Sequence, residues 1–149
     1  MLLAIDFAVV IEELSLTYVS NMEFICSYKV SEQLKELGFD EPTEKCYDTH
    51  LLKYNTDGLC DTYGFANHNA CGPEIISAPD IQTACKWITF KYGLYIRVFK
   101  LGSSFFGFEI NSIETDGIVY YDRNCCENAA ISFCCNKINE YKLKGEFLT

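Results

Sequence analysis

The residues with the clearest potential for chemistry are the cysteines and histidines of one middle segment. Both histidines of the 149-residue chain lie there, with three of its nine cysteines: Cys46, His50, Cys60, His68 and Cys71. Thiolate and imidazole are the ligands that zinc prefers, and a structural zinc site takes four of them in a tetrahedron. The spacings Cys46-x3-His50 and His68-x2-Cys71 are typical of ligand pairs. The segment is therefore a candidate zinc site, or the basis of a small thiol enzyme.

The same residues also suit a purely structural role. If residues 46–54 form a strand, Cys46 and His50 share a face but lie roughly 13 Å apart along it, too far to bind one ion. The sequence holds no Cys-x2-Cys pair, and no spacing specifies a nucleophile, a base and an orienting group. We therefore favour structural thiols and surface histidines without a cofactor, and keep zinc as the alternative.

Other catalytic patterns do not occur in the sequence. Glu12-Glu13 and Asp40-Glu41 are typical of solvated faces or turns. Gly102-Ser103-Ser104 has neither the Gly-rich run nor the following lysine of a phosphate-binding loop. We expect no catalytic residue and no small-molecule substrate.

Composition excludes some partners and indicates a compartment. Acidic residues outnumber basic ones 21 to 12, which gives a net charge of −9. Nucleic-acid binding is not expected, because phosphate contacts need clustered Lys and Arg. The apolar runs are shorter than the ~20 residues of a membrane span, and residues 1–20 lack the basic start of a signal peptide. With an odd number of cysteines, this favours a cytoplasmic protein with reduced thiols.

Local patterns predict the first elements. Val30, Leu34 and Leu37 share a helical face, which predicts a short helix over Glu32–Leu37 with Ser31 as N-cap and Gly38 after its end. Residues 46–54 and 59–65 flank an Asp-Gly turn and predict a β-hairpin. Residues 66–77 are rich in Asn, Gly and Pro, which predicts a loop.

The second half of the chain has the clearer periodicity. Pro79 at the first position and Asp80 in the first turn predict a helix that ends at Gly93 and buries Trp87 beside its apolar stripe. Alternating residues predict a three-strand meander over 94–101, 105–113 and 118–121, and Asp122 caps a final helix to about Glu140. The expected fold is α+β, an antiparallel sheet (hairpin plus three-strand meander) with helices packed on one face. Residues 22–149 are expected to form one domain, and residues 1–21 are an appendage or an extra packed element.

One face of the meander is a candidate contact surface. Strand alternation places Tyr95, Arg97 and Phe99 opposite the face that Ile96 and Val98 would bury. Aromatic residues and arginine are enriched at the energetic centres of protein interfaces. We expect these residues to contact a protein partner or a second copy of the chain; the alternative is that the N-terminal segment or the first hairpin covers them.

Three stretches also carry a resemblance: the turn Gly38-Phe39-Asp40-Glu41-Pro42, the segment SAPDIQTACKWITFKYGLYIRVF with Ala84 and Trp87, and the end, where FGFEIN is followed by YYD and AAISFCCNKI. Over roughly residues 30–140 the chain resembles a group of small proteins of unassigned activity that is associated with gut bacteria, their phages and mobile elements. The group's last helix often begins with acidic residues, where this chain has Asn124 and Cys125. The resemblance implies no activity and no site residue.

Overall fold

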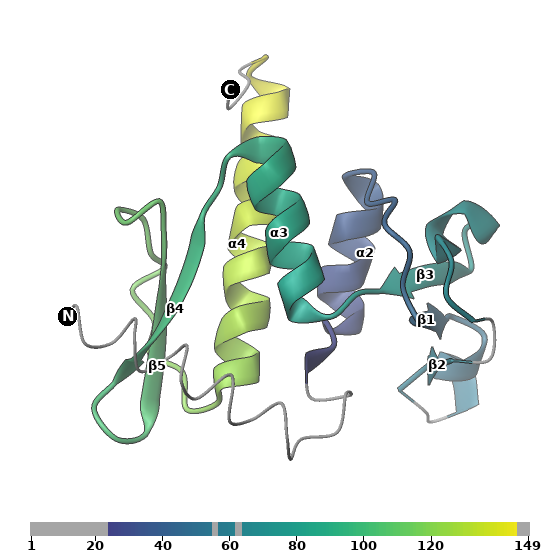
Figure 1. Cartoon of the computed structure of the whole chain (residues 1–149), viewed down its shortest axis with the longest axis horizontal. Coiled ribbons are helices and arrows are strands. Elements are labelled where there is room, and N and C mark those ends of the chain that lie inside the picture. Colours follow the sequence, from purple (N-terminus) through teal and green to yellow (C-terminus); the bar gives the residue numbers. More distant parts are fainter. Residues whose placement is uncertain (1–23, 55–56, 62–63, 146–149) are drawn as a thin grey trace. The chain divides into compact units, whose positions relative to one another are not determined.

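The computed structural model describes residues 24–54, 57–61 and 64–145 and confirms the α+β class. The expected element over residues 1–21 lies outside this part. The main elements follow one another as in Figure 1: α2 (Tyr28–Glu36), β1 (Lys45–Asp48), β2 (Leu59–Cys60), β3 (Ile75–Ala78), α3 (Ile81–Tyr92), β4 (Ile96–Leu101), β5 (Phe105–Ile110) and α4 (Arg123–Leu143). Two short 3₁₀ helices, η2 (Leu51–Tyr54) and η3 (His68–Cys71), lie in the connections. None of these described helices has both the length and the apolar character needed to cross a bilayer.

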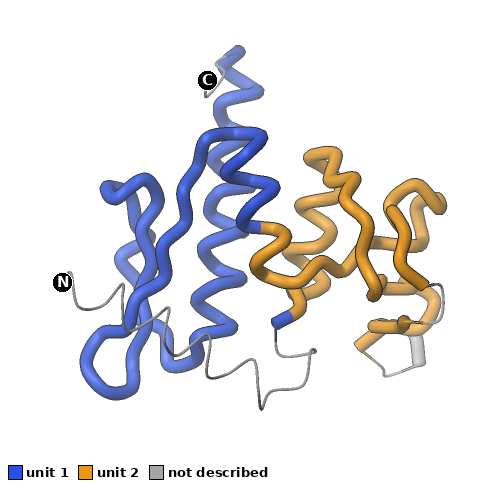
Figure 2. The backbone as a smooth tube through the Cα atoms, in the orientation of Figure 1, with its two compact units in different colours: residues 1–24, 85–149 blue, residues 25–84 orange. Residues whose placement is uncertain are grey.

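The elements divide into two compact units (Figure 2). Unit 2 comprises residues 25–84, and unit 1 includes residues 85–145. The division lies within α3, between Ala84 and Cys85. Each unit has its own antiparallel sheet, three-stranded in unit 2 and two-stranded in unit 1.

Helix α2 of unit 2 begins four residues earlier than the sequence predicts. Its N-cap is Ser27, whose side chain accepts a hydrogen bond from the amide of Val30. Ser31, the expected cap, lies inside the helix and is fully buried. The earlier start adds Tyr28, whose ring packs edge-on against Tyr47 with 5.5 Å between centroids. Gly38 follows the helix at φ +91°, as expected of a residue that must be left-handed.

The sheet of unit 2 has the order β2-β1-β3, with β1 paired antiparallel to both neighbours. The expected first hairpin is present, but its strands are shorter than predicted and η2 occupies the connection. Strand β3 occupies the last three residues of the expected loop and Ala78 after it, so the loop prediction is wrong over this stretch. The strand is held there by Asn69 of η3, which donates and accepts hydrogen bonds with Ser77 of β3. Tyr47, Ile76 and Ala78 form the apolar core of this sheet.

In unit 1, β4 and β5 form an antiparallel hairpin, and α4 packs against both strands. The face of the hairpin that packs against the core is the one expected from the sequence. Phe108 and Ile110 are fully buried on it, and the ring centroids of Phe108 and of Phe133 in α4 are 5.6 Å apart. Asp122 caps α4 by accepting from the amide of Asn124, as the sequence predicts.

The expected third strand of the meander is reduced to one bridge. Tyr120 exchanges two backbone hydrogen bonds with Phe106 of β5. Asp116 accepts hydrogen bonds from the amide of Ile118 and from the hydroxyl of Tyr120. These contacts fold the segment into a turn, and a longer ladder does not form.

Helix α3 begins at Ile81, two residues after the expected first position at Pro79. Asp80 precedes the helix, and its carboxylate accepts from the amide and the hydroxyl of Thr83. Gly93 ends the helix at φ +70°. Trp87 is 7% exposed, which confirms the expected burial.

Candidate functional sites

Cys46 and Cys60 lie directly opposite each other across the β1–β2 ladder. Their Sγ atoms are 3.4 Å apart. Cys46 is 1% exposed, whereas Cys60 is partly exposed. Burial, and then the hydrogen bond with Cys60, raises the pKa of Cys46 to about 12. The Cys46 thiol is therefore neutral, and the two sulfurs are not bonded to each other in this structure.

His50 lies beyond the end of β1, where the chain turns. Its Nε2 contacts Oε2 of Glu74 at 2.5 Å, and both side chains are more than half exposed. Glu74 precedes β3, which runs beside β1, so the sheet brings residues 24 positions apart together. This is a surface pair of the kind that contributes little to stability.

His68 is buried at the start of η3. Its Nε2 lies 3.0 Å from the carbonyl oxygen of Thr43 and 2.8 Å from that of Gly64. Because carbonyl oxygens only accept hydrogen bonds, this nitrogen carries a proton and donates. A nitrogen that carries a proton cannot bind a metal ion. Nε2 of His68 instead stabilises the loop before η3 through its hydrogen bonds to the two carbonyl oxygens.

The five Cys and His residues of the candidate zinc site do not converge on one point, because they have different partners. Cys46 and Cys60 contact each other, and Cys71 is exposed. The imidazole ring of His50 contacts a carboxylate, and that of His68 contacts two carbonyl oxygens. In residues 24–54, 57–61 and 64–145, no three His, Cys, Asp or Glu side chains form a group that could hold a metal ion.

Several other thiols also have pKa values that disfavour the thiolate. Burial raises the pKa of Cys126 to about 12 and shifts that of Cys134 upward. The pKa of Cys125 rises through burial and its hydrogen bond with Asp122. A catalytic cysteine needs the opposite shift, because the thiolate is the nucleophile. These three cysteines, and Cys46, are therefore poor nucleophiles.

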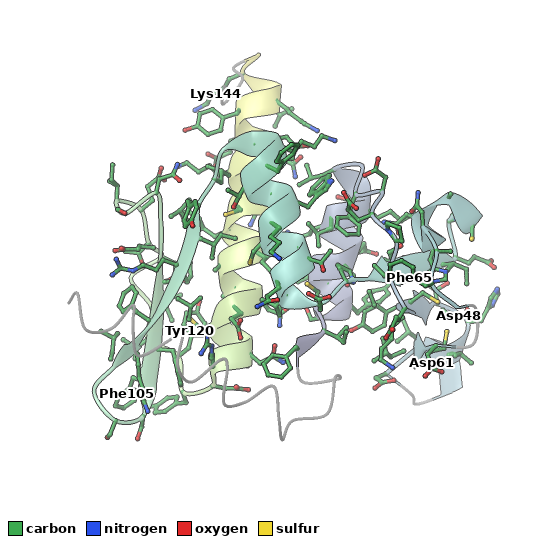
Figure 3. All side chains as sticks on the ribbon, in the orientation of Figure 1. Asp48, Asp61, Phe65, Phe105, Tyr120 and Lys144 are labelled. Carbon is green, nitrogen blue, oxygen red and sulfur yellow. The ribbon has the colours of Figure 1, made fainter. Side chains whose placement is uncertain are left out.

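The second candidate surface lies on the β4–β5 hairpin, on the side opposite the core face. We call it the outer face and define it by six residues: Tyr95, Arg97, Phe99, Leu101, Phe105 and Tyr121. The first four alternate along β4 and its start, and Phe105 pairs with Leu101. Tyr121 joins them because its ring lies 5.0 Å from that of Phe105. Figure 3 labels Phe105 at the turn end of the hairpin.

Side-chain contacts connect the residues at the centre of the outer face. Arg97 forms a 3.0 Å ion pair with Glu109, its partner across the ladder, and its guanidinium lies 5.4 Å from the ring of Phe99. Phe99 lies across Gly107, where a Cβ atom would come within 3.2 Å of the ring. The glycine thus provides the space that the aromatic ring fills.

The rim of the outer face is exposed. Tyr95 is 68% and Tyr121 80% exposed, and Leu101 and Phe105 are each 38% exposed. Ile118 and Val119, which precede the bridge to β5 in the sequence, are also about half exposed. The structure brings the three residues expected from the sequence to one face. Phe105 continues their alternation across the turn, but nothing in the sequence indicates that Tyr121 joins them.

Comparison of the chain with protein-family models, with curated proteins and with solved structures finds no match in any of the three.

Proposed function

We propose that this protein is a non-catalytic accessory or regulatory module that acts through protein contacts, and that the outer face is its contact surface. The observation that carries the proposal is the arrangement of that face. The contact between Arg97 and Phe99 lies on the same face as two exposed tyrosines, Tyr95 and Tyr121. Tyr and Arg are, with Trp, the residue types that most often dominate binding energy at protein interfaces, and side chains already held in contact lose less entropy on binding.

The partner is a different protein with a basic surface around an apolar centre. The chain has a net charge of −9. Two copies would repel each other, and a basic partner would be attracted and oriented. The same charge disfavours nucleic acid as the partner.

We place the protein in the cytoplasm, where thiols stay reduced. All nine cysteines are free thiols in the structure. The resemblance over residues 30–140 supports an origin in gut bacteria, their phages or mobile elements, and says nothing of activity. The raised pKa values of Cys46 and Cys126 support a role without catalysis by these two thiols.

The proposal is tested by comparing three forms of the protein in pull-downs from a lysate of the source cells. The test variant is Tyr95→Ser/Tyr121→Ser, which removes two exposed rings of the outer face. The matched control is Phe90→Ser in α3, which removes a ring that is 96% exposed but belongs to another element. We expect a protein that the wild type and the control retain and the test variant loses.

Circular dichroism and thermal melts of the three forms verify that each is folded. Equal retention by all three forms, or no retained protein, would contradict the proposal. Elemental analysis of the purified protein addresses the zinc alternative. One zinc ion per chain would favour that alternative over the contact surface.

A further inference from the structure

The strongest unassigned feature is the pair of thiols at Cys46 and Cys60. Residues directly opposite in an antiparallel ladder have Cα atoms about 4.5–5.5 Å apart, within the range that a disulfide spans. The two Sγ atoms already lie 3.4 Å apart. A disulfide bond is about 2.0 Å long, so side-chain rotation closes most of the gap.

We propose that Cys46 and Cys60 form a reversible disulfide when the protein meets a low-molecular-weight disulfide such as glutathione disulfide. The bond joins the central strand of the unit 2 sheet to β2, which is only two residues long. It closes a loop of chain that spans 14 positions. Oxidation therefore fixes an edge strand that otherwise depends on two residue pairs.

The exchange runs in two balanced steps. The thiolate of Cys60, the more accessible of the two, attacks one sulfur of glutathione disulfide, forming a mixed disulfide and releasing one glutathione thiolate. The thiolate of Cys46 then attacks Sγ of Cys60, forming the protein disulfide and releasing the second glutathione. Two protein thiols lose two electrons and two protons, and glutathione disulfide is reduced to two glutathione molecules.

Burial also affects the second step. The pKa of Cys46 is raised by burial, by the hydrogen bond with Cys60 and by the fields of Cys60, Asp48 and Cys71. Little of this thiol is ionised at neutral pH. Closure needs this thiolate, but it occurs within one molecule between neighbouring sulfurs, so the mixed disulfide at Cys60 is expected as a transient intermediate.

The test uses the intact chain, incubated with defined ratios of glutathione to glutathione disulfide and quenched with acid. Remaining thiols are then alkylated under denaturing conditions, and the digest is examined by mass spectrometry. We expect a cross-linked peptide pair that contains Cys46 and Cys60 and has lost two hydrogen atoms. It should appear before any cross-link among the remaining cysteines. The melting temperature of the oxidised protein should rise by roughly 5–10 °C and return on reduction.

Two variants serve as matched controls. Cys71→Ser/Cys125→Ser removes the two exposed thiols and should leave the cross-link and the thermal shift unchanged. Cys60→Ser should abolish both. The proposal is wrong if Cys46 stays fully alkylated in the wild type while the exposed cysteines are glutathionylated, or if Cys60 pairs with Cys71 instead. Neither outcome would bear on the outer face, which lies in unit 1.

Discussion

Two aromatic residues of α3, three positions apart, have opposite environments. Trp87 is 7% exposed, lies 5.7 Å from Tyr92 and has the ammonium group of Lys91 over its ring. Phe90 is 96% exposed. The same helix therefore presents one aromatic side chain to the core and one to solvent.

This contrast predicts unequal costs of truncation. Trp87→Ala should lower the free energy of unfolding by about 3–5 kcal/mol, because it removes packed surface and leaves a cavity. Phe90→Ala should change it by less than about 0.5 kcal/mol. Urea unfolding of both variants measures the difference, and a loss under about 1 kcal/mol for Trp87→Ala would contradict the burial of its ring.

Tyr47 predicts how stability responds to alkaline pH. Burial, and then the fields of Cys26 and Asp57, raises its pKa from 10.0 to about 12. Between these values the unfolded chain releases the phenolic proton and the folded chain keeps it, so stability is lost as the pH rises. Cys46 and Cys126 act in the same direction, since their pKa values rise from 9.0 to about 12.

Tyr47→Phe isolates this contribution. It also removes the 2.7 Å hydrogen bond from the hydroxyl to the carbonyl of Cys26, which costs about 1 kcal/mol at pH 8. We expect the free energy of unfolding of the variant to fall less between pH 8 and pH 11 than that of the wild type. Parallel pH profiles for the two proteins would show that the phenol of Tyr47 does not carry the effect.

At the scale of elements, the β4–β5 hairpin depends on one glycine. A Cβ atom at Gly107 would lie 3.2 Å from Phe99 and from Leu101, both on the outer face. Gly107→Val should displace the ring of Phe99 and lower the free energy of unfolding by about 1–3 kcal/mol.

A double-mutant cycle checks that the loss arises from this contact. Gly107→Val/Phe99→Ala should be less destabilised than the sum of its two single variants, because the smaller side chain makes room for valine. Additive losses, measured by urea unfolding, would mean that the two residues do not interact.

The sequence predicts those helices and strands that have a local pattern of their own, such as apolar alternation or an N-cap residue. The β4–β5 hairpin follows from alternation over six-residue strands, and α4 from its Asp122 cap. Strand β3 has four consecutive mostly buried residues and no alternation, in a stretch whose Asn, Gly and Pro content indicates a loop. It is specified by Asn69, whose backbone and side-chain groups bond with Ser77. Such tertiary contacts have no local signature.

The candidate sites show the same limit. Alternation alone predicts the shared face of Tyr95, Arg97 and Phe99. Cys46 and Cys60 lie opposite each other only because of the register of the β1–β2 hairpin. That register depends on η2 and on Gly58, whose φ is +77° and where a Cβ atom would lie 2.9 Å from Leu52. Spacing in the sequence cannot supply this information, so it predicts a five-residue zinc site that includes both cysteines and does not predict their direct contact.

At the scale of the whole chain, charge predicts the oligomeric state. With a net charge of −9, the protein should sediment as a monomer at micromolar concentration in 0.15 M salt. Sedimentation velocity of the wild type provides the measurement. A dimer that Tyr95→Ser/Tyr121→Ser dissociates would show that the outer face binds a second copy, contrary to the partner proposed above.

The uneven exposure of the cysteines makes this chain suited to spectroscopy. Cys71 in unit 2 and Cys125 in unit 1 are its two exposed thiols in the described residues, and Cys60 and Cys85 are partly exposed. After Cys60→Ser and Cys85→Ser, maleimide dyes should label Cys71 and then, more slowly because its pKa is raised, Cys125, which places one reporter on each unit. Energy transfer between the dyes would then measure the distance between the units in solution without any introduced cysteine.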